Sequence, residues 1–215
     1  MNSNNIIFKD GNSYVIREKF SEDLLVGDFN ELLKSFDDQK EEKIVRFYGK
    51  EFKKPRFDIV YGDYKFNGSG NSRSWTDLDT NNLIDNQVVN FVDYIIKDLK
   101  FGKSIGMKSL QFEDFAAVVN LYQDGSHYIG YHSDDEKNLK QGAPIYCFSL
   151  GQSRDFLLKP KKNSQGVKSA KITLRNMDLI KMCGDLQKTH LHSIPKRSTN
   201  KCFNPRISFT FRIFK

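Results

Sequence analysis

The stretch Asn120–Glu136, NLYQDGSHYIGYHSDDE, carries the densest set of chemically reactive side chains in the chain. His132 and Asp134 are two residues apart, and residues with this spacing in an extended strand point to the same face. An imidazole beside a carboxylate needs one more ligand to hold a divalent metal ion. A set of two histidines and one carboxylate with open positions is typical of non-haem Fe(II) sites that activate oxygen. The alternative is a surface strand that ends in an acidic turn, because an isolated His-x-Asp pair is common.

A third ligand could come from the later segment Thr189–Pro195, which contains His190 and His192. These two histidines share one face of a predicted strand, and either could complete a metal-binding set with His132 and Asp134. The chain between the two segments is long enough for several strands of a two-layered sheet. For any single histidine, a role in the core or at the surface is the more frequent one.

The C-terminal stretch Arg206–Arg212, RISFTFR, alternates strictly between two kinds of side chain. Its apolar residues fall on one face of a strand: Ile207, Phe209 and Phe211. The other face carries cationic and hydroxyl groups: Arg206, Ser208, Thr210 and Arg212. This polar face suits a small dicarboxylate, because arginine binds a carboxylate through a bidentate fork. The two arginines are about 20 Å apart on a straight strand, so we expect Arg206 to be the main contact. An edge strand with charges that block aggregation is the alternative.

Strand patterns follow one another from residue 112 onward, with turn signals about every ten residues, which predicts a sandwich or barrel. Eight strands are expected, at 116–123, 128–132, 145–150, 154–158, 170–174, 178–182, 189–194 and 207–213. Two helices are expected before them. One begins at Ser21 and continues to Phe36, and one covers 83–99 with an apolar stripe that would pack against a sheet. Residues 1–9 are polar and are expected to fray or to lie along the surface.

The composition of the 215-residue chain fits one folded domain, with 38% hydrophobic residues that include 18 Phe and 9 Tyr. The formal net charge of +7 favours a polyanionic partner, although it could serve solubility alone. The three cysteines, Cys147, Cys183 and Cys202, form no CxxC pair and predict a reducing compartment. No signal-peptide core and no membrane-spanning run is evident. We therefore expect a monomer of the cell interior, nuclear or cytoplasmic, that is not secreted and has no membrane partner.

A basic and aromatic segment, Val45–Tyr61, has turn residues at Gly49 and Pro55 and is expected to form a hairpin. Its positive charges are interleaved with rings: Arg46, Lys50, Lys53, Lys54 and Arg56, with Phe47, Tyr48 and Phe52. Such a hairpin could hold phosphates and insert a ring into a base stack. The alternative is an ordinary exposed hairpin with half-buried aromatic residues. The lysine-rich turn at 159–166 is a second candidate for phosphate contact.

Together these motifs resemble the AlkB family of Fe(II)- and 2-oxoglutarate-dependent dioxygenases over roughly residues 45–215. Asn120-Leu-Tyr122, His132-Ser-Asp134, His192 and the pair of arginines occur in the family's order. The resemblance implies an Fe(II) ion held by His132, Asp134 and His192, with O2 as the oxidant. It also implies a 2-oxoglutarate site formed by Asn120, Tyr122, Arg206, Thr210 and Arg212.

Finer features resemble the branch of this family that repairs duplex DNA. Phe47-Tyr48-Gly49-Lys50 is similar to a finger hairpin in which one ring, here Tyr48, fills the gap left by an extruded base. The segment 61–68 is similar to a nucleotide-recognition lid, in which either Tyr64 or Phe66 would stack on the base. The resemblance implies that DNA contacts come from the hairpin: Phe47, Tyr48, Gly49, Lys50, Lys53, Lys54 and Arg56. Asp135 and Glu136 would favour a positively charged methylated base, or they could be ordinary turn carboxylates.

The expected fold is therefore α+β and mainly β. It is a double-stranded β-helix, or jelly roll, backed by N-terminal helices and covered by a nucleotide-recognition hairpin lid. We expect one compact domain with three segments. They are an N-terminal extension and helix at 1–44, recognition hairpins with a supporting helix at 45–110, and the catalytic β-helix at 111–215.

The resemblance implies repair of double-stranded DNA by oxidative demethylation of 1-methyladenine and 3-methylcytosine. Formaldehyde, CO2 and succinate would be released, and the base would be flipped out, which costs less when it cannot pair. The alternatives are a demethylase of RNA or single strands on the same scaffold, a protein hydroxylase of the same superfamily, and a basic binding module without activity. Substitution of Tyr48 would distinguish a demethylase of RNA or single strands from an enzyme of duplex repair, because a ring that fills the gap in a duplex matters little for single strands.

Overall fold

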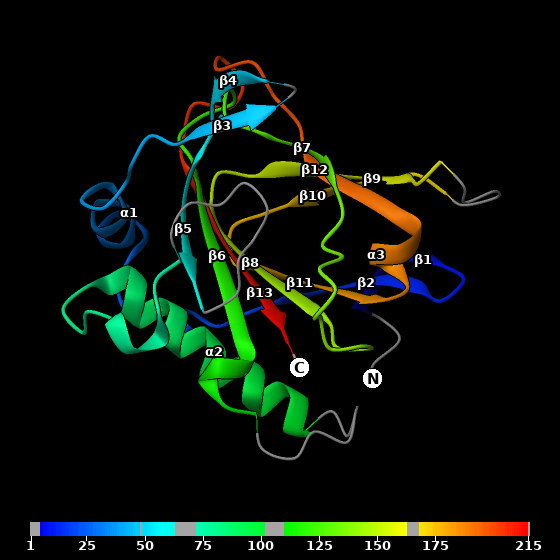
Figure 1. Ribbon diagram of the computed structural model, residues 1–215, viewed down its shortest axis with the longest axis horizontal. Coiled ribbons are helices and arrows are strands. Elements are labelled where there is room, and N and C mark those ends of the chain that lie inside the picture. The colour runs from blue at the N-terminus through cyan, green and yellow to red at the C-terminus, as the bar shows by residue number, and fades with distance from the viewer. Residues whose placement is uncertain (1–4, 48, 63–71, 102–109, 163–167, 215) are drawn as a thin grey trace.

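Two antiparallel sheets form the core of the computed structural model, which describes residues 5–47, 49–62, 72–101, 110–162 and 168–214 (Figure 1). The larger sheet has the strand order β1-β2-β11-β8-β13-β6-β5, and the smaller has the order β10-β9-β12-β7. From β6 to β13 the chain passes back and forth between the two sheets. This is the topology of a jelly roll, so the predicted fold class is confirmed.

The larger sheet contains β1 (Ile6–Asp10), β2 (Ser13–Lys19), β5 (Phe57–Tyr61), β6 (Phe115–Tyr122), β8 (Ile145–Gly151), β11 (Asp178–Gly184) and β13 (Arg206–Ile213). The smaller sheet contains β7 (Ile129–His132), β9 (Arg154–Pro160), β10 (Ala170–Leu174) and β12 (His190–Ile194). The eight strands predicted after residue 112 are confirmed, each with ends within about two residues of the expected ones. The larger sheet also takes strands from both of the N-terminal segments.

The longest helix, α2 (Leu83–Phe101), covers the outer face of the larger sheet, as its apolar stripe predicts. The ring of Phe91 stacks on Phe148 of β8 with centroids 3.9 Å apart and meets the edge of Phe209 on β13. The remaining helices are shorter: α1 (Phe29–Asp37), α3 (Leu186–Thr189) and the 3-10 turns at Glu22–Leu24, Trp75–Asp77 and Phe112–Asp114. The aromatic packing under α2 gives the larger sheet a buried outer face.

Strand β13 divides its side chains between two environments. Its apolar residues, Ile207, Phe209 and Phe211, belong to the core under α2. Its polar residues, Arg206, Ser208, Thr210 and Arg212, line a pocket between the two sheets. The alternation predicted from the sequence therefore places four polar side chains in that pocket.

The N-terminal region differs in part from the expectation. The described part of the first nine residues does not fray, because β1 pairs with β2 across a turn in which Gly11 has φ +55°, and β2 pairs with β11. It does lie along the surface, since β1 is an edge strand of the larger sheet with mostly unburied residues. The helix expected to begin at Ser21 begins later, since Ser21 caps only the 3-10 turn at Glu22–Leu24. Helix α1 starts after Asp28, which forms a capping box with Glu31.

A separate two-stranded hairpin, β3 (Ile44–Phe47) and β4 (Lys50–Lys53), forms where the basic aromatic segment predicted one. It stands at the top of Figure 1, on the opposite side of the molecule from α2. All four residues of β4 are exposed. Phe47 belongs to β3, and Gly49 makes the turn with φ +74°.

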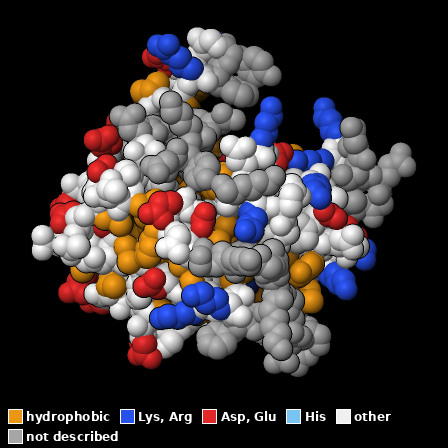
Figure 2. Space-filling model, turned by 60° about the horizontal axis from the view of Figure 1, so that its bottom comes forward, with side chains coloured by type: hydrophobic (Ala, Val, Ile, Leu, Met, Phe, Trp, Pro, Cys, Tyr) orange, Lys and Arg blue, Asp and Glu red, His pale blue; other side chains and the backbone are white. Residues whose placement is uncertain are grey.

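Charges of both signs are interspersed on the face of the molecule shown in Figure 2, with hydrophobic side chains visible between them. Among the described residues of that face, the net positive charge does not gather into one uniform patch. Within the described part of the chain, no helix has the length and apolar character needed to cross a membrane. The three cysteines are buried and form no disulfide.

Candidate metal centre and its pocket

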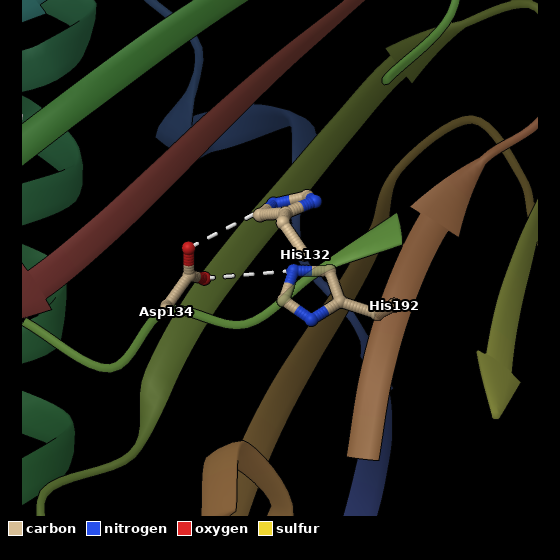
Figure 3. Close-up of side chains that lie close together, drawn as sticks. All are labelled: His132, Asp134 and His192. Atoms are coloured by element: carbon tan, nitrogen blue, oxygen red, sulfur yellow. Dashed lines mark ion pairs between the residues drawn. The ribbon is translucent and has the colours of Figure 1, made fainter. Parts of the chain in front are cut away.

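His132, Asp134 and His192 meet in the wall of the pocket between the sheets (Figure 3). His132 ends β7, and His192 lies directly opposite it on β12, so their ring centroids are only 4.2 Å apart. Asp134 follows two residues later and turns its carboxylate toward both rings. Its Oδ1 is 3.8 Å from Nε2 of His132, and its Oδ2 is 3.6 Å from Nε2 of His192. The structure thus brings together the three residues proposed as metal ligands.

The arrangement fits a single divalent ion. An ion about 2.2 Å from each ligand atom can join atoms up to about 4.4 Å apart, so both carboxylate–imidazole distances are within its reach. Nδ1 of His132 lies 2.9 Å from the carbonyl oxygen of Gly130 and must donate to it, which leaves the Nε2 lone pair for a metal. Among the described residues, Oδ2 of Asp134 is buried without a hydrogen-bond partner. These donors match the set that non-haem iron uses.

The protonation states also suit a metal site. Burial lowers the pKa of His192 to about 3, against the opposing charge of Asp134, so its imidazole is neutral at physiological pH. Burial alone would raise the pKa of Asp134, but the charges of Arg212, His192 and His132 outweigh it and lower that pKa to about 2. A neutral imidazole and an ionised carboxylate are the forms that bind metals.

Of the two histidines on β12, only His192 joins this cluster. His190 is buried at the other end of the strand, where Phe8 meets its ring edge-on. Its Nδ1 lies 2.7 Å from Oγ1 of Thr189, and its Nε2 lies 3.1 Å from the carbonyl oxygen of Lys168. The alternative that His190 is the third ligand is therefore not supported, and His190 has a structural role.

The pocket beside the candidate ligands has a volume of about 840 Å³ and contains a buried arginine. Arg206 is 2% exposed and donates from Nη2 to Oγ of Ser149 at 2.9 Å. Within the described part of the chain, its Nε and Nη1 have no hydrogen-bond partner. A buried guanidinium with open donors is costly unless an anion completes it. The geometry therefore suits the carboxylate of a bound dicarboxylic acid.

The other side chains proposed for 2-oxoglutarate also line this pocket: Asn120, Tyr122, Thr210 and Arg212. The ring of Tyr122 packs against the guanidinium of Arg206, 5.3 Å from its centroid. Arg212 forms a buried ion pair with Oδ1 of Asp134 and lies 3.8 Å from Glu136. Arg212 thus contacts a candidate metal ligand, whereas Arg206 donates to Ser149 and packs against Tyr122.

The two acids after Asp134 differ in orientation. The side chain of Asp135 is 61% exposed and accepts hydrogen bonds from Ser133 and Lys161. Glu136 is mostly buried near Arg212. Burial raises the pKa of Glu136, although the charge of Arg212 opposes the rise. Both acids line the pocket, and each is paired with a basic side chain, Asp135 with Lys161 at 3.0 Å and Glu136 with Arg212 at 3.8 Å.

The residues proposed as DNA contacts lie in different environments. Lys50 is exposed, and Lys53 is exposed and paired with Glu42. The contact proposed for Lys54 stays a prediction, since its side chain is only 7% exposed and its ammonium is 2.8 Å from the buried carboxylate of Asp58. Arg56 faces the pocket and donates to Oδ1 of Asn120 at 2.8 Å. The side chain of Phe47, and all of Tyr48, Tyr64 and Phe66, lie outside what the structure describes.

Sequence reasoning missed two residues that support the site. Gln187 on α3 accepts a hydrogen bond from the backbone N–H of Asp134 at 2.9 Å and so holds the turn that carries this ligand. Ser149 on β8 orients Arg206. The Ser149 position could have been found, because it lies on an inward face of a predicted strand. No local signal marks Gln187, whose partner is 53 residues away.

Comparisons with known proteins agree with this geometry. Residues 12–212 match the model of the 2OG-Fe(II) oxygenase superfamily. The DNA oxidative demethylase ALKBH2 of Bos taurus is 29% identical over 183 residues, which cover 78% of this chain and 56% of that protein. The human ALKBH2 is 35% identical over 100 residues, or 44% of this chain and 38% of that protein. The chain thus matches about half the length, or less, of these curated relatives.

Solved structures share the fold at low sequence identity. OsALKBH1 is 15% identical with a TM-score of 0.51, and the alignment covers 97% of this chain and 99% of that one. A prolyl hydroxylase from Trichoplax adhaerens, in complex with a hypoxia inducible factor peptide, is 12% identical with a TM-score of 0.57 over 94% of this chain and 83% of that one. With the family match over residues 12–212 and the His-Asp-His centre in agreement, the chain belongs to the 2OG-Fe(II) oxygenase superfamily.

Proposed function

We propose that this enzyme repairs DNA by oxidative demethylation of N-alkylated bases such as 1-methyladenine and 3-methylcytosine in double strands. The observation that carries the proposal is a basic residue in the wall of the pocket. Arg56, which follows β4 by three residues, is part of the wall that also holds His132, Asp134 and His192. This cation, together with exposed Lys50 and Lys53 on the preceding hairpin, suits a nucleic-acid substrate. The ALKBH2 relatives, named DNA oxidative demethylases, support the same substrate class.

The side chains of the pocket would have three roles in this reaction: they would bind 2-oxoglutarate, hold the metal ion and orient its carboxylate ligand. Arg206, oriented by Ser149, would hold the distal carboxylate of 2-oxoglutarate, with Asn120, Tyr122 and Thr210 around it. His132, Asp134 and His192 would hold Fe(II), which with 2-oxoglutarate and O2 supplies the oxidation of an N-methyl group that leaves as formaldehyde, with CO2 and succinate as co-products. Arg212 keeps the Asp134 carboxylate ionised and turned toward both imidazoles.

The acids of the pocket fit a cationic base. Methylation at N1 of adenine or N3 of cytosine gives the base a positive charge and blocks its pairing, which lowers the cost of flipping it out of the duplex. Glu136 lies in the pocket wall, close to the candidate metal ligands. A base flipped into the pocket would meet this carboxylate, whereas Asp135 is turned toward Lys161 at the rim. We infer that Glu136 favours the charged base. Such a substrate places the enzyme inside the cell, in the nucleus or the cytoplasm.

The test is direct. The protein with Fe(II) is incubated with oligonucleotides that contain one 1-methyladenine, in single- and double-stranded form, with and without 2-oxoglutarate. Mass spectrometry should show loss of one methyl group only when 2-oxoglutarate is present, and the Asp134→Ala variant should show none. Loss from single strands or RNA alone would favour a single-strand demethylase, and no loss from any strand would overturn the proposal.

A further inference from the structure

The base of the β3–β4 hairpin is closed by three side chains that form one ionic brace. Lys43 directly precedes β3, and Lys54 directly follows β4. Both ammonium groups approach the carboxylate of Asp58 on β5. Nζ of Lys54 is 2.8 Å from Oδ1, and Nζ of Lys43 is 3.6 Å from Oδ2 and donates to the carbonyl oxygen of the same residue at 2.9 Å. One carboxylate therefore contacts both ends of the hairpin.

This brace is buried, so its geometry is restricted. The side chain of Asp58 is 1% exposed, and those of Lys54 and Lys43 are 7% and 20% exposed. Burial lowers the pKa of Lys54, while the charge of Asp58 opposes that effect. Removal of one charge from a buried group of this kind leaves the others uncompensated. The two lysines consequently hold the hairpin at a defined position on β5.

Within the described part of the chain, the hairpin projects from the rest of the molecule as a separate two-stranded sheet. It is a two-stranded ribbon, and such ribbons are at best marginally stable in isolation. Both faces of β4 are exposed. At its base, the N–H of Lys54 donates to the carbonyl oxygen of Lys43 at 2.7 Å, so the strand ends meet where Asp58 lies. The brace thus acts at the base of the hairpin, where a small change in the angle between the hairpin and β5 would move the hairpin turn by a larger distance.

The brace also adjoins the reactive pocket. Asp58 pairs in register with Asn120 on β6, and Asn120 accepts the hydrogen bond of Arg56. The strand that anchors the hairpin is therefore paired with the strand that carries the proposed 2-oxoglutarate contacts. The distance from brace to pocket is one strand spacing, about 4.8 Å.

We propose that Asp58 is a positioning residue that sets the direction of the β3–β4 hairpin over the pocket, so that the hairpin turn can engage duplex DNA. The inference rests on the proposed function, because it concerns how that substrate is held. Asp58 is not among the residues that line the pocket, although its strand pairs with the strand that carries Asn120. Its loss should therefore affect double-stranded substrate, which needs the hairpin, far more than single-stranded substrate, which does not.

The test compares Asp58→Asn with a matched control, Asp178→Asn. Asp178 on β11 is equally buried, with a side chain 1% exposed, and it bridges Lys19 at 2.9 Å and Arg17 at 3.6 Å. It is separated from β5 by β8, β13 and β6. For Asp58→Asn, kcat/KM on double-stranded 1-methyladenine substrate should fall about tenfold, with little change on the single strand of the same sequence. Asp178→Asn should leave the ratio of kcat/KM for the double-stranded substrate to kcat/KM for the single-stranded substrate unchanged.

A second measurement needs no turnover. Amide hydrogen exchange at residues 44–53 should become faster in Asp58→Asn and stay unchanged in Asp178→Asn. If Asp58→Asn does not fold, Lys43→Met, which removes both contacts of Lys43 to Asp58 but keeps the 2.8 Å pair of Lys54 with Asp58, should show the same changes to a smaller extent. Unchanged exchange together with an unchanged substrate ratio would overturn the proposal. If the wild-type enzyme demethylates neither substrate, the proposed function fails while the exchange result still decides the role of Asp58.

Discussion

Replacement of Arg206 by lysine should weaken the binding of 2-oxoglutarate without unfolding the protein. Arg206 is 2% exposed and lines the pocket, its Nη2 donates to Ser149, and within the described part of the chain its Nε and Nη1 have no hydrogen-bond partner. A lysine keeps the positive charge but presents a single ammonium on a flexible stem. It cannot both reach Ser149 and bind a carboxylate through two parallel hydrogen bonds. The variant should therefore lose one charge-assisted hydrogen bond while the fold persists.

The size of the effect follows from that one bond. A hydrogen bond to a charged group contributes about 1.5–3 kcal/mol, and each 1.4 kcal/mol is a factor of ten, so affinity should fall roughly 10- to 150-fold. Calorimetric titration of 2-oxoglutarate into protein loaded with redox-inert Mn(II) measures the dissociation constant without turnover. The KM for 2-oxoglutarate should rise by a similar factor in the Fe(II) enzyme.

Arg154→Lys is the matched control for this measurement. Arg154 is also buried near Tyr122, but it donates to three backbone carbonyls, those of Asp124, His127 and Pro195. Its replacement should lower the free energy of unfolding and leave 2-oxoglutarate affinity within about threefold of wild type. The reasoning is refuted if folded Arg206→Lys binds 2-oxoglutarate within that same range, or if both variants lose affinity equally.

Four further outcomes are expected. Phe91→Ala should lower the free energy of unfolding by about 3–5 kcal/mol, measured in urea, because its buried ring packs between α2 and the larger sheet. Lys50→Ala should reduce the slope of log K against log salt for DNA binding by about one, whereas Lys54→Ala should not, because Lys54 is buried in an ion pair. Burial raises the pKa of Asp155, but hydrogen bonds from two basic neighbours outweigh it and hold that pKa below 3.8. Asp155→Asn should therefore be less stable than wild type at pH 7, with the difference lost as the pH falls through the folded-state pKa. Asp134→Ala should abolish specific Fe(II) binding in equilibrium dialysis, because it removes the only carboxylate of the candidate set.

Each of these outcomes has a contrary result that would count against its reasoning. Phe203→Ala, at a ring 69% exposed, should leave the free energy of unfolding within about 0.5 kcal/mol of wild type. An equal change of salt slope in Lys50→Ala and Lys54→Ala would mean that the ammonium of Lys54 reaches DNA. A stability difference for Asp155→Asn that persists in acid would exclude its ion pairs as the cause. Metal binding retained by Asp134→Ala would place the ion elsewhere.

The sequence was most informative where a side chain's direction follows from strand alternation. The polar face of β13 and the shared face of His132 and Asp134 are both set by the period of two, so the pocket could be assembled before any coordinates. The stripe of α2 likewise predicts the packing against the larger sheet. In these cases local geometry alone determines what a residue faces.

Other features depend on partners that are far along the chain. Whether Lys54 faces solvent or Asp58 is decided by how the hairpin leans on β5, which no local pattern encodes. The choice between His190 and His192 required the register of β12 against β7. The strands β1 and β2 meet at the turn Asp10-Gly11-Asn12, but their place in the larger sheet depends on the pairing of β2 with β11, which is far along the chain. The Asp28–Glu31 capping box was likewise readable and shows where α1 begins.

Because the two faces of β13 lie in different environments, substitutions along this strand should have two kinds of effect. Substitutions at Ile207, Phe209 and Phe211 would act through the aromatic core and alter how much folded protein accumulates. Substitutions at the intervening positions would alter turnover while abundance stays near normal. A scan of single variants along these eight residues should therefore give two profiles, one for protein level and one for activity per molecule, that are out of phase by one residue.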